Sequence, residues 1–69
     1  MPETPLENWN LVPGTLVEVY RDGTLLRTGR IDAVTLDADI VWLANSGAHP
    51  RRLFEKSEGY RLHLVADRD

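Results

Sequence analysis

The alternation of apolar and polar residues along the chain is the spacing expected of half-buried β-strands. In Leu16–Arg21 (LVEVYR), Val17 and Val19 fall on one face and polar side chains on the other. Asp22-Gly23 follows directly, and both residue types tolerate the positive φ angles of a tight type I′ turn. The pattern therefore predicts a first strand over residues 16–21 that turns back as a hairpin.

The segment after this turn, Thr24–Val34 (TLLRTGRIDAV), continues as a second strand of unusual length. Gly29 lies in its middle. A glycine inside a strand indicates a bulge or a sharp bend, the device that curls a sheet over a core. We therefore expect a bulge or bend at Gly29.

Three further strands are expected, over Ile40–Leu43, His49–Phe54 and Tyr60–Val65, with turns at residues 36–39 and 45–47 and a single helical turn at 55–59. Ile40–Leu43 is apolar throughout, so we expect it to be covered on both faces or to expose one face to a partner. Pro50 lacks a backbone N–H and places the start of its strand at a sheet edge.

Short strands with turns at regular intervals, and no helical periodicity, are typical of an all-β domain. We predict a five-stranded small β-barrel with one helical turn before the last strand. The expected organisation is a flexible N-terminal arm over residues 1–9, the barrel over 10–65 and a C-terminal tail over 66–69.

The apolar and glycine positions of the first motif of Sm-like proteins have counterparts here: Val17, Val19, Asp22-Gly23, Gly29, Ile31, Val34 and Ile40–Leu43. Over about three quarters of its length the chain thus resembles the SH3-like and Sm-like small barrels. This resemblance implies a bent second strand and two short sheets joined by a one-turn helical link.

The residues that bind RNA in Sm-like proteins are not matched. Thr35 stands where that family has aspartate, and Asp39 where it has the asparagine that contacts a base. Glu58-Gly59 takes the place of its Arg-Gly pair. The acidic replacements repel phosphate. An oligomeric Sm-like RNA-binding protein is therefore the alternative hypothesis and not the favoured one.

The 69 residues carry a net charge of −3, but from residue 10 to residue 65 seven acidic side chains balance seven basic ones. A neutral body lacks the broad attraction that non-specific nucleic-acid binding needs. The chain has no cysteine, no long apolar run and no basic-then-apolar start. We accordingly expect a cytoplasmic protein without membrane contact.

No arrangement of residues indicates catalysis. Asp37-Ala38-Asp39 has the spacing of paired carboxylates but is more typical of a turn. His49 and His63 are the only histidines, and nothing resembles a nucleophile elbow. We expect a protein that is not an enzyme and that uses neither a cofactor nor a metal.

Four arginines are candidates for nucleic-acid contacts: Arg27, Arg30, Arg51 and Arg52. Arg51 and Arg52 are adjacent, so on a strand they point to opposite faces and at most one of them joins a given surface. The favoured interpretation is that the arginines pair with Glu18, Asp32 and Glu55 across strands.

Four aromatic residues are candidates for contacts with a partner: Trp42, Trp9, Tyr20 and Tyr60. Tryptophan is enriched at binding hot spots, and Trp42 lies in the strand that is apolar on both faces. Either the arm carrying Trp9 or a second subunit could cover the outer face of that strand. We therefore expect a non-catalytic interaction module that binds another protein or its own copies.

Overall fold

The chain folds into a single antiparallel sheet, and the computed structural model describes residues 5–65. The strands are β1 (Leu16–Arg21), β2 (Thr24–Val34), β3 (Ile40–Leu43), β4 (Arg52–Glu55) and β5 (Tyr60–Leu64), with one 3-10 turn, η1 (Lys56–Glu58). They lie in the order β4-β3-β2-β1-β5. The expected all-β class, the five strands and the helical turn before the last strand are confirmed.

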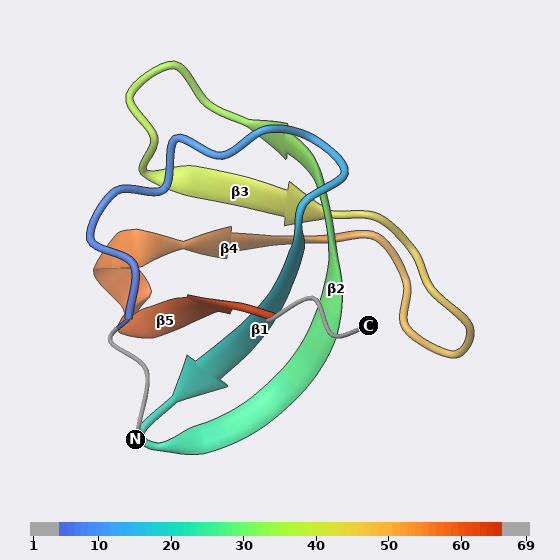
Figure 1. Cartoon of the computed structure of the whole chain (residues 1–69). Helices are drawn as coiled ribbons and strands as arrows, with labels where there is room; N and C mark the ends of the chain where they lie inside the picture. The colour runs from blue at the N-terminus through green and yellow to red at the C-terminus, as the bar shows by residue number, and fades with distance from the viewer. Residues whose placement is uncertain (1–4, 66–69) are drawn as a thin grey trace.

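The length of β2 lets it belong to both halves of the sheet. Its first part, up to Arg30, pairs with β1, and its last part, from Ile31, pairs with β3. Between these parts the strand curves strongly, so that β3 and β4 lie across from β1 and β5 (Figure 1). The two halves of one sheet thus enclose a common core.

The β1–β2 hairpin is as predicted: Asp22 and Gly23 both have positive φ angles, of 54° and 78°. Of the bulge or bend expected at Gly29, the bulge is wrong, because Gly29 pairs in regular register with Val17 and the register shifts lie elsewhere, after Val19 in β1 and after Ile31 in β2. The strand does curve strongly in this region (Figure 1). A Cβ on Gly29 would lie 3.3 Å from Leu43 Cδ1. The glycine therefore leaves room for the close approach of Leu43 and does not form a bulge.

The fourth strand begins later than expected, at Arg52 rather than at His49. His49 and Ser46 instead exchange two backbone hydrogen bonds of 2.8 Å, which close the tip of the β3–β4 loop. Pro50 has no N–H for the ladder, and its carbonyl accepts a side-chain hydrogen bond from Arg27. The backbone groups of these loop residues thus form hydrogen bonds outside the strand ladder, and the ladder starts only after them.

The core combines residues of all five strands with one residue that precedes them. Its buried members are Trp9, Val17, Val19, Ile31, Val41, Leu43, Phe54, Tyr60 and Leu62. The backbone N–H of Leu6 donates to the carbonyl of Leu62 at 2.8 Å, which holds the N-terminal segment against β5. The part of the proposed arm over residues 1–4 and the proposed tail over 66–69 lie outside the described residues.

The two edges of the sheet are β4 and β5, which are connected along the chain by η1 and Gly59. Gly59 has a φ of 91°, a left-handed conformation that glycine adopts without strain and that lets the chain reverse directly into β5. Among residues 5–65 no strand ladder joins β4 to β5, so the sheet is open at this side. The backbone hydrogen bonds of the described residues therefore do not close the sheet into a barrel.

Candidate interaction surfaces

The alternation of β3 separates its core residues from Trp42. Val41 and Leu43 are fully buried, whereas Trp42 is half-buried on the opposite face of the strand. The guanidinium carbon of Arg51 lies 4.1 Å from the centroid of the Trp42 ring, and Arg51 Nε donates to Asp32 Oδ2 at 2.6 Å. Of the cross-strand ion pairs expected for the arginines, this one is confirmed.

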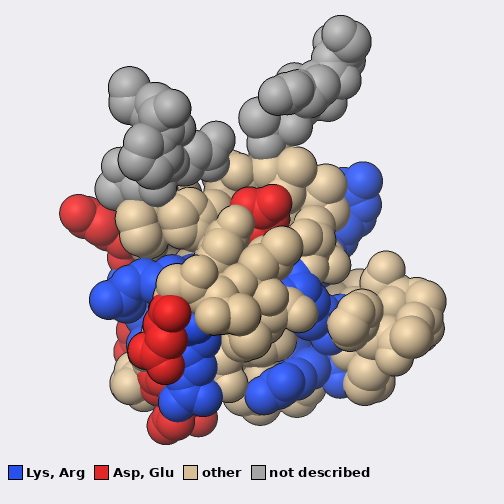
Figure 2. All heavy atoms as spheres, turned by 90° about the horizontal axis from the view of Figure 1, so that it is seen from below, with Lys and Arg blue, Asp and Glu red and all other residues tan. Residues whose placement is uncertain are grey.

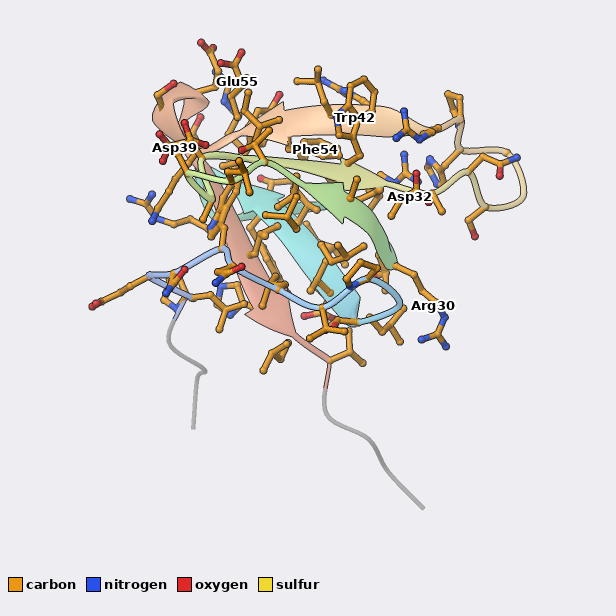
Figure 3. The ribbon with its side chains drawn as sticks, turned by 90° about the horizontal axis from the view of Figure 1, so that it is seen from above. Arg30, Asp32, Asp39, Trp42, Phe54 and Glu55 are labelled. Atoms are coloured by element: carbon orange, nitrogen blue, oxygen red, sulfur yellow. The ribbon has the colours of Figure 1, made fainter. Side chains whose placement is uncertain are left out.

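Leu53 pairs with Trp42 across β3 and β4 and is 38% exposed. In Figure 3 Trp42 points away from the core on the far side of the sheet, while Phe54 points into the space between its halves. We call the surface formed by Asp32, Trp42, Arg51 and Leu53 the outer aromatic patch. It offers an aromatic ring and an aliphatic side chain beside one positive and one negative group.

The side chain of Arg52 lies on the other face of β4, as the alternation of a strand requires. Its Nη2 donates to Tyr60 Oη at 3.3 Å, and its guanidinium carbon lies 4.9 Å from the Phe54 ring. Arg21, at the end of β1, places its guanidinium carbon 4.9 Å from the centroid of the Tyr60 ring. Arg21, Arg52 and Tyr60 thus form a second surface, which we call the arginine cluster.

Arg27 is buried, with 7% of the residue exposed. Its Nη1 donates to the carbonyl of Pro50 at 2.8 Å and its Nη2 to that of Ala44 at 3.0 Å. Burial lowers the pKa of the Arg27 guanidinium, and the neighbouring charge of Arg52 lowers it further. The side chain therefore fastens both ends of the β3–β4 loop to β2.

The four arginines considered for nucleic acid do not share one surface. Arg51 lies on the outer aromatic patch, Arg52 on the opposite face of β4, and Arg27 is enclosed beneath the loop. Arg30 donates to the carbonyl of Gly14 at 3.0 Å, next to the start of β1. A continuous basic track, as single-stranded nucleic acid requires, is therefore not assembled from them.

The aromatic candidates are also dispersed. Trp9 is 1% exposed in the core, so its ring is not available on the surface. The Tyr20 ring packs edge-on against His63 at 4.8 Å, and its hydroxyl donates to Glu18 Oε1 at 3.3 Å, on the outer face of the other half of the sheet. Trp42 and Tyr60 belong to the two surfaces described above. Trp42 is the one of the two tryptophans whose ring a partner could reach.

Sequence reasoning missed Arg21 and Leu53 as members of these surfaces. Arg21 follows Val17 and Val19 at the same alternation, so its side chain starts on the core face and reaches the open side of the sheet. This alternation is a signal in the sequence from which the position of Arg21 can be predicted. Leu53 could be placed only through its pairing with Trp42, since a single leucine in a strand carries no such signal.

Asp39, which stands where Sm-like proteins have a base-contacting asparagine, lies in an acidic hollow. A shallow hollow of about 470 Å³ is lined by Asp37, Asp39, Ile40, Glu55, Lys56 and Ser57. The backbone N–H of Lys56 donates to the carbonyl of Asp39 at 2.8 Å, which ties η1 to the β2–β3 turn. Three carboxylates against one ammonium group make this hollow unfavourable for a phosphate backbone.

The β2–β3 turn holds Asp37 through two hydrogen bonds. Thr35 Oγ1 donates to Asp37 Oδ1 at 2.7 Å, and the backbone N–H of Asp39 donates to the same oxygen at 3.2 Å. The bond from Thr35, and after it that from Asp39, lowers the pKa of Asp37 because both stabilise the carboxylate. The expected turn is therefore present over these residues.

Replacing Thr35 with valine should raise the pKa of Asp37 toward its ordinary value. The lowered pKa means that the charged carboxylate stabilises the fold above the pKa of the unfolded chain. This contribution is lost as the pH falls through the lowered value. An NMR titration of the Asp37 carboxyl carbon in both proteins measures the difference. An unchanged pKa in Thr35→Val would contradict the role of the hydroxyl.

Comparison with known proteins finds nothing similar to this chain. No family model, no curated protein and no solved structure matches it. Among residues 5–65, no three histidine, aspartate or glutamate side chains gather in a group that could hold a metal ion. No helix in this range is long and apolar enough to cross a membrane.

Proposed function

We propose that the chain is a non-catalytic interaction module of the SH3-like small-barrel type, which binds another protein or its own copies through the outer aromatic patch. The observation that carries this proposal is the placement of Trp42. The core is filled by other residues, and Trp42 stands outside it on the opposite face of β3. A large aromatic side chain in this position is explained by a contact that the single chain does not make.

The immediate surroundings of Trp42 support binding rather than packing alone. Arg51 stacks on the ring, and its ion pair with Asp32 fixes the guanidinium in place. Both charged side chains are nearly half exposed, at 47% and 42%, so their ion pair adds little to stability. It does restrict the ring and the guanidinium before a partner arrives, which lowers the entropic cost of association. Tryptophan and arginine are also the residues most enriched at hot spots.

The SH3-like assignment is supported by the sheet order, by the curved β2 shared between two half-sheets and by the single 3-10 turn before β5. In this arrangement residues 5–15 do not cross the outer face of β3. Residues 6 and 9 of that segment engage β5 and the core instead. Of the two covers considered for the outer face of Trp42, the described part of the arm is used elsewhere, which supports a partner as the cover.

The test is the replacement of Trp42 with serine. Light scattering on a sizing column over a range of concentrations measures self-association, and copurification from the source cells measures binding to another protein. We expect Trp42→Ser to abolish whichever association the native chain shows. Because the ring is half exposed, the free energy of unfolding should fall by only about 1 kcal/mol.

The matched control is Leu36→Ser, which removes a fully exposed apolar side chain in the β2–β3 turn, away from the patch. It should leave association unchanged. The proposal is contradicted if Trp42→Ser lowers stability without affecting association, or if the two variants weaken association equally. Arg51→Gln should weaken association less than Trp42→Ser does, because it keeps the Trp42 ring but removes the charge stacked on it.

A further inference from the structure

The arginine cluster holds positive charge that the described part of the chain does not neutralise. We propose that Arg21, Arg52 and Tyr60 bind the carboxylate of an acidic segment of the partner protein. This inference rests on the proposed function, since it takes the ligand to be a protein. It concerns the face of β4 opposite to the outer aromatic patch.

The geometry joins two guanidinium groups to one tyrosine. Arg52 Nη2 donates to Tyr60 Oη at 3.3 Å, and the guanidinium carbon of Arg21 lies 4.9 Å from the centroid of the same ring. The Tyr60 ring is itself fixed, because it is buried to 92% and meets the Phe54 ring edge-on at 5.0 Å. Two cations are therefore held on one rigid ring, with further N–H donors free to meet an anion.

No carboxylate balances these cations within the described part of the chain. The single ion pair among residues 5–65 is that of Arg51 with Asp32, which lies on the other face of β4. Figure 2 shows the side of the molecule seen from below, where basic side chains extend across the lower middle while acidic ones gather mainly to the left. An unpaired group of like charges beside an apolar core favours an external anion.

Arg27 adds a third charge behind this cluster. It is buried, and its two hydrogen bonds go to neutral carbonyls rather than to a carboxylate. Its Nε has no hydrogen-bond partner among the described residues. A buried guanidinium without a counter-ion is unfavourable, and the nearby charge of Arg52 adds to this. A carboxylate bound at Arg52 would offset the repulsion between the two arginines.

A protein carboxylate fits better than a nucleic-acid backbone. A single cluster can neutralise one anionic group, whereas a nucleic acid needs several phosphate contacts along a track. Arg30 and Arg51 lie on other surfaces and do not extend the cluster into such a track. The hollow at the η1 end carries carboxylates, which would repel the next phosphates of a strand.

The experiment uses a blocked tetraglutamate peptide as the probe and the matching tetraglutamine peptide as the neutral reference. Binding is followed by NMR through the arginine Nε–Hε signals of the full chain. We expect saturable shifts of Arg21 and Arg52 with tetraglutamate and none with tetraglutamine. Arg52→Gln should weaken binding by about tenfold or more, since it removes a charge-assisted hydrogen bond.

The matched control is Arg61→Gln, which removes the same charge from an exposed position on the opposite face of β5. It should leave the affinity for tetraglutamate unchanged. Arg21→Gln provides a second test in case Arg52→Gln disturbs the fold, which circular dichroism would reveal. Equal weakening by Arg61→Gln and Arg52→Gln, or no saturable binding, would overturn the site.

A short single-stranded RNA serves as the competing ligand. Tighter binding of RNA than of tetraglutamate, lost in Arg52→Gln, would overturn the assignment to a protein carboxylate. Trp42→Ser separates this inference from the proposed function, because it should leave tetraglutamate binding intact while abolishing association. If association depends on Trp42 but tetraglutamate does not bind, the carboxylate site alone is wrong.

Discussion

Replacing Trp9 with alanine should lower the free energy of unfolding by about 3–5 kcal/mol, the range for deleting a large buried aromatic side chain. Trp9 is 1% exposed and belongs to the same core as residues of all five strands. A domain of this size buries only about 60% of the surface of its unfolded chain and has little stability in reserve. The substitution should therefore leave the protein close to unfolding at room temperature.

Urea unfolding followed by circular dichroism measures this effect without relying on tryptophan fluorescence. The informative control is Trp42→Ala, which deletes the other tryptophan and should be much less destabilising, by about 1 kcal/mol. A loss of less than about 1 kcal/mol in Trp9→Ala would mean that the N-terminal segment does not complete the core. Substitution of Trp9 is thus expected to affect mainly stability, and substitution of Trp42 mainly binding.

Replacing Arg27 with alanine should lower the free energy of unfolding by about 2–3 kcal/mol, because hydrogen bonds from a charged group contribute about 1.5–3 kcal/mol and the side chain also leaves a void. The bonds in question run to the carbonyls of Ala44 and Pro50. Without them the β3–β4 loop loses its attachment to β2. Amide hydrogen exchange in residues 44–50 should become faster as well.

Arg27→Met separates the packing of this side chain from its charge. Methionine keeps a long, unbranched apolar side chain that fills more of the site than alanine, and it removes a buried charge that lacks a carboxylate partner, so it should destabilise less than alanine. Faster amide exchange in the loop is expected in both variants, since neither can donate to the two carbonyls. Normal exchange in Arg27→Ala would show that the loop is held by the hydrogen bonds between Ser46 and His49 alone.

The strands of this protein follow from local sequence patterns. The hairpin at Asp22-Gly23 requires two positive φ angles, and few residue types permit them. The period of two places Val17, Val19 and Leu62 on the core side without reference to any other strand. The 3-10 turn that ends at Gly59 is also predictable from the sequence, because a short polar segment followed by glycine is typical of a helical turn with a left-handed C-cap.

The errors concern contacts between residues that are distant in the chain. A glycine within a strand predicts a bulge or a bend, but the close approach of Leu43 from β3, which leaves little room for a side chain at Gly29, cannot be predicted from it. The sequence predicts a start of β4 at His49, three residues too early, because local composition does not show the hydrogen bonds between Ser46 and His49 or that from Arg27 to the Pro50 carbonyl. Local patterns predict strands but not what packs against them.

For the candidate surfaces, local sequence alone predicts that Arg51 and Arg52 belong to opposite faces and that Ile40–Leu43 has an apolar outer side. Which aromatic residue a partner can reach depends on how the strands and the N-terminal segment pack together. Trp9 and Trp42 are indistinguishable as residue types, but Trp9 is buried in the core while Trp42 lies outside it. A side chain is buried only if another segment packs against it. The curvature of β2 determines which segments of the sheet face each other, and local sequence does not show that curvature.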